Sequence, residues 1–95
     1  MKETVESVAK WADETFGECT PKKALIRAFD EIDELFEAHS QPDRTISSMV
    51  EEAADVCITL YRYIYLVDPD AIEKKMAINR ARKWKLDGKG TAQHE

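Results

Sequence analysis

The sequence predicts an all-α protein, a four-helix bundle that works as an oligomer. Apolar residues recur every three to four positions along most of the chain, as on the buried face of a helix. Only three glycines and three prolines occur among 95 residues, and the 43% hydrophobic and 35% charged fractions are typical of a globular helical protein. We expect a single domain over residues 1–95. A chain this short buries a small share of its surface, so we also expect a partner subunit.

The first two helices are predicted by apolar stripes and by the signals at their ends. Gly17 follows the first stripe, where helices commonly end, and Thr20 and Pro21 provide a cap and a first helical residue for the second helix. The second helix should run to about His39. The first stripe consists of Val5, Val8, Ala9, Ala12 and Phe16. The second consists of Leu25, Phe29, Ile32 and Phe36, with Ala28 and Leu35 on its flank.

A loop around residues 40–48 precedes the third helix. Pro42 disfavours a helical conformation at Gln41, and the next helix can be capped by Asp43, Thr45 or Ser47. The helical period then continues from Ile46 to Asp68. Aromatic and branched residues there would also suit a strand, but the unbroken 3.6-residue pattern favours a helix.

The fourth helix is predicted over residues 70–86. Asp68 and Pro69 repeat the cap and first-residue pattern that Thr20 and Pro21 form. From about residue 86 the chain contains two of its three glycines, and we expect a flexible tail there.

Charge and cysteine content narrow the class of protein. The net charge of −5 and the pI of about 5.1 argue against a binder of nucleic-acid polymers. Cys19 and Cys57 do not form the pattern of a secreted disulfide framework. The N-terminal segment lacks an unbroken apolar stretch, and the most apolar run is split by Arg62. We therefore expect a cytoplasmic protein without membrane association.

Two pairs of carboxylates occur at helical spacing. Glu31 and Glu34 lie one turn apart on the second helix, and Glu52 and Asp55 lie one turn apart on the third. Antiparallel packing of these helices would bring the pairs face to face, forming the all-oxygen site that Mg²⁺ or Mn²⁺ prefers. The alternative is a pair of solvated acidic faces, and spacing alone favours that alternative. The third helix is otherwise largely apolar, however, and buried carboxylates need a partner or a metal.

A basic strip on the fourth helix has the complementary charge. Lys75, Asn79 and Arg82 follow one another at helical spacing and would suit the outer phosphates of a nucleotide. A solvated face near the end of a helix is the alternative. Trp11 lies off the first apolar stripe and could stack on a base, although a subunit contact is the more ordinary role for such a residue.

Three segments together resemble the MazG-like all-α nucleoside triphosphate pyrophosphohydrolases: DEIDELFEA, EEAADVCITL and KKMAINRARKW. They match the family's ordered E-x-x-E, E-x-x-D and Lys-Asn-Arg signature, over about residues 21–85. The segments WADETFG and GKGTAQH are similar to the phage-associated dATP/dGTP pyrophosphohydrolase branch. Two positions depart from the usual family pattern: Asp30 precedes Glu31, and Thr59 stands where many relatives carry Tyr.

The resemblance implies a Mg²⁺-dependent hydrolase, with Mn²⁺ as an alternative, that cleaves (d)NTP to (d)NMP and pyrophosphate. Deoxynucleotides are expected, and purines are a candidate base class. It further implies a homodimer or homotetramer with sites between helices of different subunits.

The implied metal-binding and catalytic residues are Glu31, Glu34, Glu52 and Asp55. Lys75, Asn79 and Arg82 would contact the substrate's phosphate or sugar. A non-catalytic helical dimer that regulates or binds a protein partner is the rival interpretation.

Overall fold

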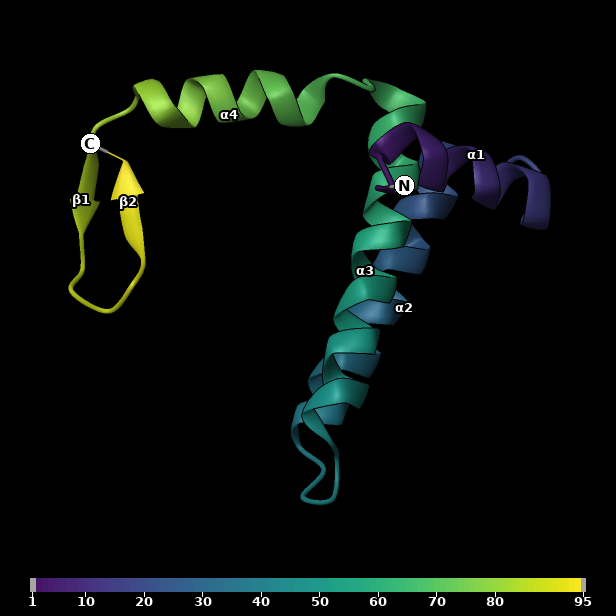
Figure 1. The fold of residues 1–95 in the computed structure, drawn as a ribbon, viewed down its shortest axis with the longest axis horizontal. Coiled ribbons are helices and arrows are strands. Elements are labelled where there is room, and N and C mark those ends of the chain that lie inside the picture. Colours follow the sequence, from purple (N-terminus) through teal and green to yellow (C-terminus); the bar gives the residue numbers. More distant parts are fainter. Residues whose placement is uncertain (1, 95) are drawn as a thin grey trace.

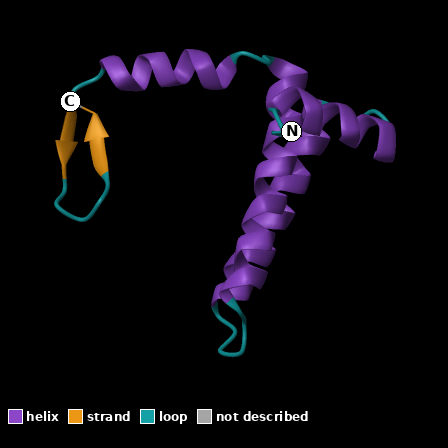
Figure 2. Ribbon diagram, viewed as in Figure 1, coloured by secondary structure: helices purple, strands orange, loops and turns teal. Residues whose placement is uncertain are grey.

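The computed structural model describes residues 2–94, and within them the chain forms four helices and a short β-hairpin (Figures 1 and 2). The all-α prediction is confirmed, with this small hairpin added. No helix among these residues is long and apolar enough to span a bilayer. The elements are α1 (Val5–Phe16), α2 (Pro21–His39), α3 (Ile46–Val67), α4 (Ala71–Ala81), β1 (Trp84–Leu86) and β2 (Ala92–His94).

The first three helices begin at threonine caps. Thr4 forms a capping box with Ser7, Thr20 accepts a hydrogen bond from the Lys23 amide at 3.2 Å, and Thr45 accepts one from the Ser48 amide at 3.1 Å. Each threonine satisfies a backbone N–H that has no partner within the helix. The predicted starts of α2 and α3 are therefore confirmed, and Thr45 is the cap that the loop uses.

The sequence predicted Asp68 as the cap of the fourth helix, and this prediction is wrong. Asp68 ends α3, and α4 begins at Ala71 after Asp70, whose side chain makes no capping bond. The Asp68 carboxylate accepts a hydrogen bond from the Asp70 amide at 3.1 Å and pairs with Lys74 at 2.9 Å. These contacts shape the turn between the two helices.

Helices α2 and α3 form an antiparallel hairpin, and α1 packs across α3 (Figure 1). Alanines occupy the buried apolar positions: Ala9 and Ala12 of α1 with Ala24, Ala28 and Ala38 of α2. Small side chains allow helix backbones to approach closely. The apolar stripe that the sequence assigned to the α2 core instead leaves Phe29 and Phe36 largely exposed.

Helix α4 leaves the end of α3 and, within residues 2–94, lies apart from the three packed helices (Figure 1). It ends at Ala81 rather than near Leu86 as predicted, because Arg82 takes an extended conformation. The Trp84 indole N–H then donates to the Asn79 carbonyl at 2.9 Å, satisfying one of the last carbonyls of the helix.

A β-hairpin occupies the segment in which the sequence suggested a flexible tail. Trp84 pairs with His94 and Leu86 with Ala92 in antiparallel register. The Asp87 carboxylate accepts hydrogen bonds from the amides of Lys89 and Thr91, at 2.7 and 3.2 Å, and so organises the turn. Gly88 and Gly90 have φ of 75° and 86°, a conformation that glycine adopts without steric cost.

One partly buried ion pair fixes α1 on α3. The Arg62 guanidinium donates to the Asp13 carboxylate at 2.8 and 3.2 Å, and it also donates to the Gly17 carbonyl. The Arg62 side chain is only 13% exposed. Removing its partner would leave a buried charge with fewer acceptors, which is costly.

We therefore expect Asp13→Ala to lower the free energy of unfolding by about 1–3 kcal/mol. Urea denaturation at matched protein concentration measures this difference. Lys10→Ala is the control, because it breaks the exposed Glu6–Lys10 pair on the same helix and should leave the unfolding midpoint close to that of the wild type. Equal unfolding midpoints for the two variants would contradict the role given to Arg62.

Candidate active site

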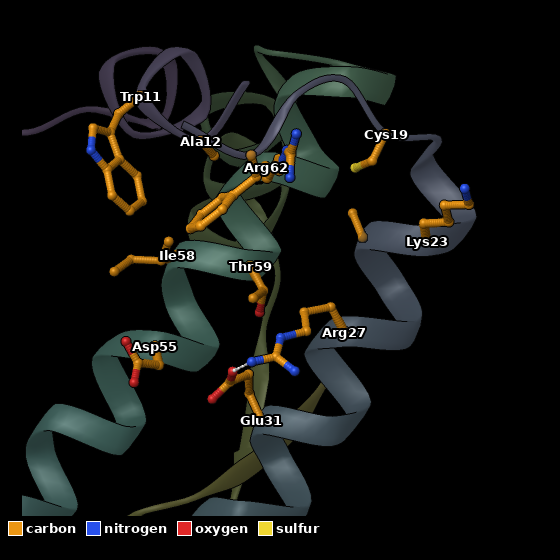
Figure 3. A pocket seen from close by; sticks show the side chains of 12 residues that line it. Trp11, Ala12, Cys19, Lys23, Arg27, Glu31, Asp55, Ile58, Thr59 and Arg62 are labelled. Atoms are coloured by element: carbon orange, nitrogen blue, oxygen red, sulfur yellow. Dashed lines mark ion pairs between the residues drawn. The ribbon is translucent and has the colours of Figure 1, made fainter. Parts of the chain in front are cut away.

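A pocket of about 570 Å³ lies between α1, α2 and α3 (Figure 3). Glu31 of α2 and Asp55 of α3 line one end, and Trp11 of α1 lies at the other. Trp11 contacts Phe16 edge to face, with ring centroids 5.4 Å apart, so the α1 wall of the pocket is aromatic. The pocket thus combines an acidic end with an aromatic wall.

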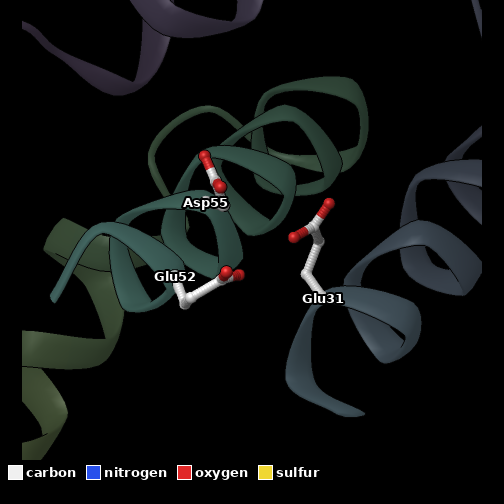
Figure 4. A group of neighbouring side chains, drawn as sticks. All are labelled: Glu31, Glu52 and Asp55. Atoms are coloured by element: carbon white, nitrogen blue, oxygen red, sulfur yellow. The ribbon is translucent and has the colours of Figure 1, made fainter. Parts of the chain in front are cut away.

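Three carboxylates meet across the α2–α3 contact at the acidic end (Figure 4). Glu31, Glu52 and Asp55 each offer an oxygen, and these oxygens lie within 4.8 Å of one another. Glu52 and Asp55 reach the same side because they are three residues apart on α3. We call Glu31, Glu52 and Asp55 the carboxylate trio.

Glu31 is the most buried member of the trio. The residue is 6% exposed. Burial raises the pKa of its carboxyl group, Arg27 lowers the pKa in part, and Glu34 and Asp55 raise it further. A buried carboxylate beside two others needs positive charge, and three converging oxygens suit a hard divalent cation. The residues present therefore fit a metal ion.

Two arginines flank the trio. Arg27 pairs with Glu31 at 2.7 Å, and Arg44, from the α2–α3 loop, approaches Glu52 at 3.6 Å. Neither was identified from the sequence. The spacing of Arg27 and Glu31, four residues apart on a helix, was a usable signal. No sequence pattern indicated Arg44, because its position depends on how the loop folds back.

The fourth predicted carboxylate, Glu34, is exposed on α2. It is close enough to Glu31 to raise the pKa of that residue, but it is outside the group whose oxygens lie within 4.8 Å. Its assignment as a metal ligand stays a prediction.

The predicted phosphate-binding residues lie on a different part of the chain. Lys75 and Asn79 belong to α4 and Arg82 follows it, whereas the trio lies on the α2–α3 hairpin (Figure 1). Because α4 projects away from that hairpin, one chain does not bring the basic strip to the carboxylates. Trp11, by contrast, lines the same pocket as Glu31 and Asp55.

Comparisons of sequence and structure relate this chain to known proteins. No protein-family model matches the chain. The solved structure of the cyanophage S-2L MazG-like pyrophosphohydrolase, bound to dGDP and three catalytic Mn²⁺ ions per active site, is similar, with a TM-score of 0.67 and 29% identity. The similarity covers 96% of this chain and 88% of that one. The chain belongs to the MazG-like pyrophosphohydrolase superfamily.

A second relative points to the phage branch of the MazG-like proteins. A dATP/dGTP diphosphohydrolase of Salmonella phage PMBT28 is 34% identical over 90 residues, which are 92% of this chain. The chain spans 29% of that relative's length. The resemblance inferred from the E-x-x-E and E-x-x-D segments is therefore confirmed at the level of the family.

The raised pKa of Glu31 has a consequence for stability. The folded protein holds a proton that the unfolded chain releases, so stability falls as the pH rises through the folded-state pKa. At neutral pH the ionised carboxylate therefore opposes folding unless a cation binds it. Glu31→Gln should raise the Tm in EDTA by about 2–6 °C and abolish the stabilisation that Mn²⁺ gives the wild type.

Thermal unfolding at neutral pH, in EDTA and in Mn²⁺, measures both effects. Glu37→Gln is the control, because Glu37 is an exposed carboxylate on the same helix. A Glu31→Gln variant that is less stable than wild type in EDTA, or that Mn²⁺ still stabilises fully, would show that Glu31 is not a strained metal ligand.

Proposed function

We propose that this chain is a nucleoside triphosphate pyrophosphohydrolase that converts (d)NTP to (d)NMP and pyrophosphate with the help of a divalent cation. The observation that carries the proposal is the carboxylate trio, in which buried Glu31 faces Glu52 and Asp55 at the end of a nucleotide-sized pocket. One relative is named as a dATP/dGTP diphosphohydrolase, and the other was solved with dGDP bound. Both names support deoxypurine triphosphates as the substrates.

The acidic end of the pocket would take the phosphates. Glu31, Glu52 and Asp55 would hold Mg²⁺ or Mn²⁺, with Glu34 as a further candidate ligand beside Glu31. A cation bound there would neutralise the triphosphate and activate a water molecule for attack on the α-phosphate. The Mn²⁺ ions of the cyanophage relative support a divalent cation at this place.

The aromatic wall would take the base. Trp11 is half exposed and lines the pocket at the end away from the trio, so its ring is available for stacking (Figure 3). The Arg62–Asp13 pair holds α1, and with it Trp11, in place over α3.

A second copy of the chain would complete the site. Large apolar side chains are exposed on all four helices of one chain, among them Phe29 and Phe36 on α2, Val67 on α3, and Ile72 and Met76 on α4. Burying them between copies would be favourable. We propose a homodimer or homotetramer in which α4 of one copy brings Lys75, Asn79 and Arg82 to the carboxylate trio of another.

The reaction is tested by ion-exchange analysis of the products formed from common NTPs and dNTPs. We expect monophosphate and pyrophosphate in Mg²⁺ or Mn²⁺ and neither in EDTA. Replacing Glu52 by Gln and Asp55 by Asn should lower turnover more than about 100-fold while the helical content is retained. Glu51→Gln is the matched control, since Glu51 is an exposed neighbour on α3.

Turnover by the double variant at the wild-type rate would show that the trio takes no part in the reaction. A folded wild-type protein that turns over none of the nucleotides would instead favour the non-catalytic helical dimer.

Subunit complementation tests the shared site. One variant lacks Glu52 and Asp55 as above, and the other carries Lys75→Ala and Arg82→Ala. Each alone should be nearly inactive, but mixed dimers would contain one intact site, so an equal mixture after subunit exchange should recover about a quarter of wild-type activity. Activity that stays at the sum of the two separate variants would mean that the site is built within one chain.

A further inference from the structure

Arg27 and Glu31 form an ion pair whose two partners have unequal surroundings. The Arg27 Nη2 and the Glu31 Oε1 lie 2.7 Å apart on one face of α2, and both residues line the pocket (Figure 3). The Glu31 side chain is buried, whereas the Arg27 side chain is 61% exposed. The carboxylate is therefore held between helices while the guanidinium sits on a long arm that solvent reaches.

The order of the two residues along α2 makes this pair a poor stabiliser of the helix itself. Oppositely charged residues four apart stabilise a helix best when the acid precedes the base, as Glu6 precedes Lys10 on α1. Here Arg27 precedes Glu31. The negative charge of the trio gives a better reason for the pair. The Arg27 guanidinium lowers the pKa of Glu31 and so partly offsets the rise that burial causes.

A divalent cation at the trio would compete with Arg27 for the negative charge of the Glu31 carboxylate. A cation held by the trio would be bound by the same Glu31 carboxylate whose Oε1 the guanidinium contacts. Once Glu31 is neutralised in this way, Arg27 loses its strongest partner and remains in the pocket. A guanidinium matches the geometry of phosphate oxygens as well as that of a carboxylate.

We propose that Arg27 is an exchangeable counter-cation and a phosphate-positioning residue. It neutralises Glu31 when no divalent cation is bound, and it turns to the phosphates of the nucleotide when the trio binds one. This inference rests on the proposed function, since it requires both a cation at the trio and phosphates in the pocket. It assigns Arg27 no part in the bond-breaking step.

The proposal predicts effects of opposite sign on two ligands. Arg27→Gln should bind Mn²⁺ alone about two- to fivefold more tightly than wild type, because a competing charge is gone. In saturating Mn²⁺ the same variant should bind dGDP about five- to twentyfold more weakly, because a charged contact to phosphate is lost. Isothermal titration calorimetry measures both affinities without reference to turnover.

Two further variants make the experiment decisive. Lys10→Gln breaks a pair of the same spacing on α1, outside the pocket, and should leave both affinities unchanged. Arg27→Lys keeps the charge but loses the planar fork, so its Mn²⁺ affinity should stay near wild type while its dGDP affinity falls. Arg27→Lys also provides the test if Arg27→Gln does not fold.

The outcomes separate this inference from the function it rests on. A wild-type protein that binds Mn²⁺ and dGDP, with Arg27→Gln equal to it in either affinity, would overturn the role of Arg27 alone. Weaker Mn²⁺ binding by Arg27→Gln would do the same, because Arg27 would then support the cation rather than compete with it. A folded wild-type protein that binds no Mn²⁺ would overturn the proposed function together with the inference.

Discussion

The buried carboxylate of Glu31, facing Glu52 and Asp55 across the contact between α2 and α3, is the constraint on which the rest of the structure depends. Ala24, Ala28 and Ala38 occupy the α2 positions that are buried with Glu31. Small residues at these positions allow the two helices to approach closely enough for carboxylates on both to meet. The repulsion that results opposes folding, and positive charge from arginine or a metal ion relieves it.

The alanine core has a second consequence, because it leaves the large apolar side chains for other contacts. Phe29 and Phe36 are mostly exposed on α2, and α4 carries its own apolar residues away from the packed helices. The two parts of the proposed nucleotide site, the carboxylate trio and the basic residues of the α4 region, therefore lie apart within one chain. Association of copies would bury the apolar residues and join the halves in one step.

Much of this arrangement was predictable from local sequence patterns. The threonine caps and the period of 3.6 residues define the starts of α2 and α3, and the spacing of Glu52 and Asp55 places both on one face. The end of α4 was not predictable, because it depends on the Trp84 hydrogen bond to Asn79 and on the turn around Asp87. The buried face of α2 was also misassigned: hydrophobicity alone favours phenylalanine over alanine, and the close approach of α3 reverses that preference.

The proposed chemistry requires the carboxylate trio to bind a divalent cation. Anomalous diffraction at the manganese absorption edge, from crystals of the wild-type protein grown with Mn²⁺ and dGDP, tests it most directly. We expect a strong anomalous peak within coordination distance of Glu31, Glu52 and Asp55, at about 2.0–2.3 Å from their oxygens. A well-ordered trio without such a peak, or manganese bound only elsewhere on the chain, would contradict it.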